Sequence, residues 1–231
     1  MIQTPFDPSD LRGDSERIID RLAQIHAVWW DHPRLGKELG GFPNEDNILF
    51  FAGPSGYEKR LAYAVDLVGD RFATARRKIY ERALGSYPFK DLRGVSRLSP
   101  GNRLTTINGD LDYTNVFYPT GPNQHPVYVI DWALWEARVG TDDVAQIGLY
   151  GHCDAKTNLT RDLVRRYYDG LQRHGIKDYQ WEDCWHDYRL STIRALFKAI
   201  MPFRDGERSW VILEHAFDSF YDLECEELLT S

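Results

Sequence analysis

Residues 104–146 organise the chain and read LTTINGDLDYTNVFYPTGPNQHPVYVIDWALWEARVGTDDVAQ. Three short apolar runs in this segment have the composition of strands, at residues 104–107, 116–118 and 127–130. Polar side chains with oxygen donors stand next to these runs, at Asp110, Asn115 and Asp131. The pattern predicts a small sheet, including a β-hairpin, that brings these three side chains together.

This order of residues is typical of phosphoryl transfer from a nucleotide. An aspartate, four intervening residues, an asparagine and a later aspartate supply a group for the acceptor hydroxyl and two ligands for a metal. We expect Asp110 to take or orient the hydroxyl proton, and Asn115 and Asp131 to hold Mg²⁺ through hard oxygen atoms. The Asp-to-Asn spacing alone is common in loops that carry an Asx turn. The strands around it and the acidic pair Asp142-Asp143 make the combination specific.

Most of the remaining chain has the apolar periodicity of helices. The expected helices cover residues 14–31, two segments within 57–84 separated near Gly69-Asp70, and residues 142–152, 159–172, 183–200 and 207–229. Residues 33–56 are expected to form a loop with one buried turn at 48–52, and Arg76, Arg77 and Lys78 a solvated face. No linker or repeat is present, so we expect a single α+β, mostly helical domain over residues 1–231.

Composition narrows the function classes. With 231 residues, 42% of them hydrophobic, the chain can bury a core, and its net charge of −7 without a dense basic run argues against nucleic acid and anionic membranes as partners. No apolar run reaches the length of a membrane span and the start lacks a secretion signal, so we expect a cytoplasmic protein. The cysteines are odd in number and far apart, which favours buried free thiols: Cys153, Cys184 and Cys225.

Four segments together resemble a known family. They are NGDLDYTN at 108–115, VIDW at 129–132, GTDDVA at 140–145 and LAQIHAVWW at 22–30. They are similar to the catalytic core of the aminoglycoside phosphotransferase and choline kinase-like superfamily, and LAQIHAVWW to its ecdysteroid kinase-like branch in particular. The resemblance runs from about Ile18 onward and covers the carboxy-terminal lobe only.

The resemblance implies a protein kinase-like carboxy-terminal lobe and ATP- and Mg²⁺-dependent phosphorylation of a hydroxyl on a small molecule. It implies Asp110 as catalytic base, and Asn115 and Asp131 as Mg²⁺ ligands that also bind the nucleotide. Asp143 would steady the catalytic loop, and His26 would be structural.

Two departures from the family pattern have consequences. Asn108 stands where the family has histidine before Gly-Asp, so an amide nitrogen must replace an imidazole donor. Only seventeen residues precede Ile18, too few for a sheet with a phosphate-covering loop and a strand lysine. Gly53-Pro-Ser-Gly56 and the surroundings of Lys37 are better interpreted as turns. We therefore expect the amino-terminal nucleotide lobe to be absent from this chain.

Alternative functions remain open at the level of sequence. The chain could be a catalytically inactive binding or interaction module that associates through the face left by the missing lobe. A weaker alternative is a metal-dependent phosphohydrolase that uses Asp110, Asp112 and Asp131, although Asp112 is expected rather to turn the loop. Trp132 and Trp135 suit stacking on a base or a quaternary cation, but core packing is the commoner role for such residues.

Overall fold

The computed structural model describes residues 11–36, 39–41, 54–68, 72, 74–85, 102–119, 126–150, 157–200 and 206–229. Several sequence expectations concern residues outside this set: Lys37, the apolar patch 48–52, Gly53, the helix break at 69–70 and Cys153. Helices dominate the described residues and short strands accompany them, which confirms the expected α+β, mostly helical class. No helix among them is long and apolar enough to cross a membrane.

The chain divides into two compact units, which we describe separately. Unit 1 comprises residues 1–42 and 99–188, and unit 2 comprises residues 43–98 and 189–231. The division falls within the helix α8 (Trp181–Ile200). The expectation of a single domain over residues 1–231 stays a prediction.

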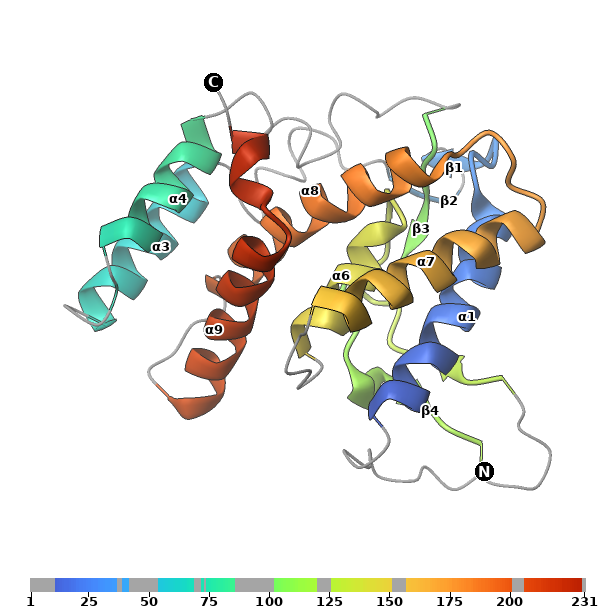
Figure 1. Cartoon of the computed structure of the whole chain (residues 1–231), viewed down its shortest axis with the longest axis horizontal. Helices are drawn as coiled ribbons and strands as arrows, with labels where there is room; N and C mark the ends of the chain where they lie inside the picture. Colours follow the sequence, from blue (N-terminus) through green and yellow to red (C-terminus); the bar gives the residue numbers. More distant parts are fainter. Residues whose placement is uncertain are drawn as a thin grey trace. The chain divides into compact units, whose positions relative to one another are not determined.

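Unit 1 is built around the helices α1 (Leu11–Trp29) and α7 (Thr157–Arg173), which lie side by side (Figure 1). Of the apolar positions that predicted α1, Ile18, Ile19 and Leu22 are fully buried whereas Val28 is 65% exposed, and the helix begins three residues before the expected cap at Asp14. Arg166 of α7 bridges to α1, at 2.7 Å from Asp20 and 2.9 Å from Glu16. These hydrogen bonds raise the pKa of Arg166, so the bridge keeps its charge.

Three pairs of short strands belong to unit 1. They are β1 (Leu35–Gly36) with β2 (Leu39–Gly41), β3 (Thr105–Ile107) with β6 (Glu136–Arg138), and β4 (Val116–Phe117) with β5 (Tyr128–Val129). The first pair is parallel and the other two are antiparallel. The three expected strands and the hairpin of β4 and β5 are confirmed. The partner of β3 was not expected, because only Ala137 of β6 is buried between polar neighbours.

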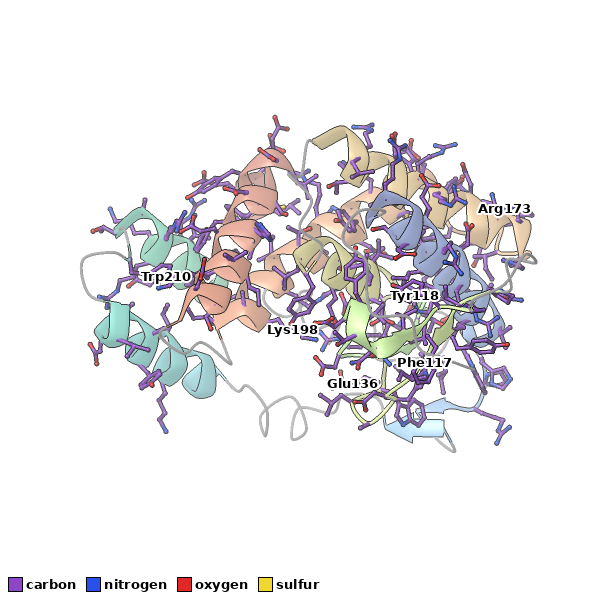
Figure 2. The ribbon with its side chains drawn as sticks, turned by 90° about the horizontal axis from the view of Figure 1, so that it is seen from below. Phe117, Tyr118, Glu136, Arg173, Lys198 and Trp210 are labelled. Carbon is purple, nitrogen blue, oxygen red and sulfur yellow. The ribbon has the colours of Figure 1, made fainter. Side chains whose placement is uncertain are left out.

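Figure 2 labels one residue of each antiparallel strand pair: Phe117 lies on β4 and Glu136 lies on β6. After β6 the chain turns directly into the helix α6 (Thr141–Tyr150). Its first turn holds Asp142 and Asp143, both buried. The helix expected from this acidic pair is therefore confirmed, and it points its amino-terminal end toward the strands.

Unit 2 contains α3 (Pro54–Val68), α4 (Thr74–Gly85), α9 (Glu207–Asp222) and the short 3₁₀ helix η5 (Cys225–Leu229), together with the second half of α8. Tyr80 lies at its centre, edge-on to the rings of Phe197 and Phe217. Its hydroxyl donates to the Leu196 carbonyl at 2.8 Å, and burial raises the pKa of Tyr80. The predicted pair of helices within 57–84 is confirmed, although residues 54–56 open α3 instead of forming a separate turn.

The prediction of a solvated face on α4 is wrong for one of its three residues, Arg76. Arg76 donates two hydrogen bonds to Glu214, at 2.6 and 2.5 Å, and its guanidinium lies 4.6 Å from the centre of the Phe217 ring. Because Arg76 precedes the buried Tyr80 by four residues, both side chains lie on the same helix face. Arg77 and Lys78 are exposed, as expected.

Two of the expected free thiols are described and both are buried, Cys184 in unit 1 and Cys225 in unit 2. Burial raises the pKa of the Cys184 thiol, and raises the pKa of Cys225 to about 12. Thiols held in their protonated form are poor nucleophiles and poor metal ligands. The expectation of buried free thiols is therefore confirmed for these two residues.

Candidate active site

The candidate site is the loop between β3 and β4, which ends in the 3₁₀ turn η4 (Tyr113–Asn115). Gly109 opens this loop with a φ of +79°, a conformation that favours glycine. A side chain at Gly109 would also collide with the carbonyl of Leu134, in the turn that the Trp135 N–H closes on the Trp132 carbonyl. Close approach of these two backbone segments explains the glycine before Asp110.

The Asp143 carboxylate fixes the backbone at the start of the loop by hydrogen bonds. It accepts the backbone N–H of Asn108 at 2.7 Å and that of Gly109 at 3.2 Å, and it is fully buried. The contact confirms the steadying role expected for Asp143. Gln146, which sequence reasoning did not single out, accepts the Leu111 N–H at 2.7 Å. Its position three residues after Asp143, on the same face of α6, was the available signal.

Asn108 joins the loop to the segment that carries Asp131. Its side-chain nitrogen donates to the carbonyls of Ile130 at 3.1 Å and Asp131 at 3.0 Å. Its side-chain oxygen accepts the Asp110 N–H at 3.2 Å. Asparagine at the family's histidine position thus makes a positioning contact through its amide, as the sequence led us to expect. Asp131, held at its carbonyl by Asn108, has a φ of +55°.

Asn115 completes the connection. Its side-chain nitrogen donates to the Asp110 carbonyl at 2.9 Å, and its own carbonyl accepts the Ile130 N–H at 3.0 Å. Since the amide nitrogen is used in this bond, the side-chain oxygen is the atom left to face a cation. Asp110 and Asn115 are half-buried, and Asp131 is exposed. The structure brings the three predicted residues together through these bonds, and their catalytic and metal-binding roles stay predictions.

The His26 side chain contacts Asp143 and Tyr167. Its Nε2 is 3.4 Å from the Asp143 carboxylate and its Nδ1 is 2.8 Å from the Tyr167 hydroxyl, in a fully buried position. Burial raises the pKa of Tyr167, which keeps the phenol neutral. A side chain at Gly140 would collide with Tyr167 and His26. The structural role expected for His26 is confirmed.

Asp112 turns the loop, as expected. It accepts the N–H of Thr114 at 2.9 Å and the Thr114 hydroxyl at 3.1 Å, and so caps η4. Within the described part of the chain no group of three or more His, Cys, Asp or Glu side chains is arranged to hold a metal ion. Asp110, Asp112 and Asp131 are therefore not grouped as three ligands of one metal ion.

Core packing was the favoured expectation for Trp132 and Trp135, and it is wrong. Both indoles are half-buried and line a pocket in unit 1. The indole N–H of Trp132 donates to the Val129 carbonyl at 3.0 Å, so this hydrogen bond closes the short segment that contains Asp131. Alternation along the strand does not reveal this position, because Trp132 follows the strand instead of belonging to it.

Comparison with known proteins gives structural neighbours only. No protein-family model matches the sequence, and no curated protein sequence matches it. An ethanolamine kinase of Plasmodium vivax is similar in structure with a TM-score of 0.56 and 11% identity, over 96% of this chain and 62% of that kinase. A choline kinase of Cryptosporidium parvum gives a TM-score of 0.53 and 14% identity, over 99% of this chain and 69% of that kinase.

The chain thus spans less than two thirds of the ethanolamine kinase that it resembles. At such low identity the likeness concerns the fold, and the ecdysteroid kinase-like branch and the restriction to one lobe stay predictions. The segments that suggested a kinase in the sequence and the structural neighbours agree on the same architecture. This chain has the mostly helical, protein kinase-like α+β fold that ethanolamine and choline kinases also have.

Proposed function

We propose that this chain is a phosphotransferase that uses ATP and Mg²⁺ to phosphorylate a hydroxyl of a small molecule in the cytoplasm. The hydrogen-bonded frame of the loop carries the proposal. Asp143 fixes the backbone at Asn108 and Gly109, and Asn108 in turn fixes the backbone at Asp131. Positioning of this kind is the main contribution that a protein makes to phosphoryl transfer.

The residues present fit a magnesium ion. Asn115 has its amide nitrogen committed to Asp110, so its side-chain oxygen and the exposed Asp131 carboxylate provide hard oxygen donors on adjoining segments. Two such donors, with waters and phosphate oxygens, are the usual protein share of a Mg²⁺ site. When bound, the ion neutralises charge on the phosphates. Asn115 and Asp131 would hold it.

Asp110 is the group proposed to act on the acceptor. Its backbone is fixed on both sides, by the Asn108 oxygen at its N–H and by the Asn115 amide at its carbonyl. The half-buried carboxylate can therefore orient an incoming hydroxyl and accept its proton as the oxygen attacks phosphorus. Amino alcohols are the first acceptors to test, because the two structural neighbours are ethanolamine and choline kinases.

The test is turnover of Mg-ATP with a panel of acceptors that includes ethanolamine, choline and an aminoglycoside. Asp110→Asn keeps the size and most hydrogen bonds of the side chain and removes the base. We expect it to lower turnover at least about a hundredfold. Asp169→Asn, an exposed aspartate on α7, is the matched control and leaves turnover unchanged. Turnover that survives Asp110→Asn contradicts the role proposed for Asp110.

A second candidate is a catalytically inactive binding module. The sequence left this alternative open. A rise in melting temperature with Mg-ATP or an acceptor, without any turnover, would favour this candidate. Sedimentation would show whether the module associates with itself.

A further inference from the structure

A pocket of about 400 Å³ lies in unit 1, apart from the carboxylates of the candidate site. Four aromatic side chains line it: Trp29, Tyr128, Trp132 and Trp135. Its volume falls within the range of small-molecule sites, about 300–1,000 Å³. Asp110, Asn115 and Asp131 are not among its lining residues. The proposed phosphotransfer therefore does not account for this pocket.

The aromatic walls are held in place before any ligand arrives. The Trp132 indole is fixed by its hydrogen bond to the Val129 carbonyl, and Trp29 packs edge-on against His32 with ring centres 4.9 Å apart. Tyr128 is 40% exposed and belongs to the hydrogen-bonded pair of β5 with β4. Rings that are already fixed lose little conformational freedom on binding, which favours affinity for a flat ligand.

The charge of the lining residues indicates which kind of planar ligand the pocket would bind. Of the described residues that line the pocket, Arg21 is the one that carries a charge, and no carboxylate lines it. One guanidinium nitrogen of Arg21 donates to Gln24 at 2.5 Å, whereas its Nε is buried without a hydrogen-bond partner among the described residues. Because the Arg21 side chain lines the pocket, a ligand carboxylate beside its guanidinium would form a charge-assisted hydrogen bond, which is stronger than one between neutral groups.

A cationic ligand would have the opposite effect. Aromatic cages bind ammonium groups through their ring faces. Here the guanidinium of Arg21 would repel such a group, and no acidic side chain among the described lining residues offsets the repulsion. The quaternary cation considered for Trp132 and Trp135 from the sequence is therefore disfavoured at this pocket.

We propose that this pocket binds a planar aromatic acid, with its ring against Trp29, Trp132 and Tyr128 and its carboxylate on Arg21. This site is independent of the proposed phosphotransferase activity. It takes a ligand of the opposite charge to the amino alcohols proposed as acceptors. Binding there can therefore be measured without ATP, metal or turnover.

Three probes with one ring system test the proposal: 1-naphthaleneacetate, 1-naphthaleneacetamide and 2-(1-naphthyl)ethylamine. They carry charges of −1, 0 and +1 near pH 7 and are otherwise closely matched. Calorimetric titration of the full chain should give an affinity for the acetate at least tenfold above that for the amine, with the amide between them. Arg21→Gln should reduce this preference to threefold or less, since it removes the charge and retains a polar side chain.

A second variant separates this site from binding elsewhere. Tyr128→Ala should weaken all three probes at least fivefold, because it removes one wall of the pocket. Tyr63→Ala is the matched control, since Tyr63 is 47% exposed on α3 of unit 2, and it should change none of the affinities. The proposal is overturned if the amine binds as tightly as the acetate, if either pocket variant behaves like the wild type, or if no probe binds at millimolar concentration.

Discussion

Replacement of Asp143 by alanine tests the frame that positions the candidate catalytic loop. The change removes the acceptor of two backbone N–H groups, those of Asn108 and Gly109, and the partner of His26 at 3.4 Å. Each buried donor left without an acceptor costs about 1–3 kcal/mol. We therefore expect Asp143→Ala to lower the free energy of unfolding of unit 1 by about 2–5 kcal/mol. Such a loss is a large share of the stability of a typical domain.

Asp143→Asn gives a graded version of the same test. Asparagine has nearly the same shape and retains one oxygen acceptor, so it can keep the bond to Asn108, at 2.7 Å the shorter of the two. It loses the charge, which strengthens bonds to a buried carboxylate. We expect its cost to be about half that of alanine, in the range of 1–3 kcal/mol.

Urea unfolding followed by tryptophan fluorescence measures the global effect, and amide hydrogen exchange measures the local one. The amides of Asn108 and Gly109 should exchange faster in both variants, and faster in the alanine variant than in the asparagine variant. Asp169→Ala, which removes an exposed ion pair with Arg165 on α7, is the control and should stay within about 1 kcal/mol of the wild type. An alanine variant as stable as this control, with unchanged exchange at both amides, would refute the reasoning.

Three further predictions concern other parts of the chain. Gly140→Ala should lower the urea midpoint by the equivalent of about 1–3 kcal/mol, since an added Cβ has no space there. Glu214→Gln should cost at most about 1 kcal/mol at pH 7, because the pair with Arg76 is partly exposed. The hydrogen bond from Arg76 lowers the pKa of Glu214, so the wild type loses this contribution as pH falls through that lowered pKa, and the stability curves of the two proteins should converge in acid, below the ordinary pKa of a glutamate. Cys184 and Cys225 should resist thiol reagents until the protein is unfolded, as mass spectrometry of labelled peptides would show.

The helices were predictable from the sequence because their signal is local. In α1, for example, Ile18, Ile19 and Leu22 are buried at the helical spacing that the sequence shows. Pairings between distant segments were harder to predict. Arg76 has the appearance of a surface residue until α9 places Glu214 and Phe217 beside it. Likewise β6 has only one buried residue, Ala137, and its register on β3 depends on a tertiary contact.

The candidate site likewise has features that could be predicted from the sequence and features that could not. Asp110, Asn115 and Asp131 could be selected from the sequence because their types and spacing suit phosphoryl transfer, and Asp143 because of the family resemblance. The hydrogen bonds that hold these residues in place could not be predicted from the sequence. Asn108 uses both the nitrogen and the oxygen of its amide to join two backbone segments, one after β3 and one after β5, that are distant in the sequence. The pocket behind Trp132 was equally hidden, since its walls come from segments distant in the chain.

Apart from Asn115, the side chains that support the loop differ from those proposed to act in phosphoryl transfer. Asp143 and Gln146, buried on α6, accept N–H groups of the loop, and Asn108 is buried between the loop and Asp131. By contrast, the Asp110 side chain is half-buried and the Asp131 side chain is exposed. Asp110→Asn should therefore remove activity at a smaller cost in unfolding free energy than Asp143→Ala, because the Asp143 carboxylate is fully buried. Substitution of Asp143 should lower both, because activity then falls through loss of the loop's geometry.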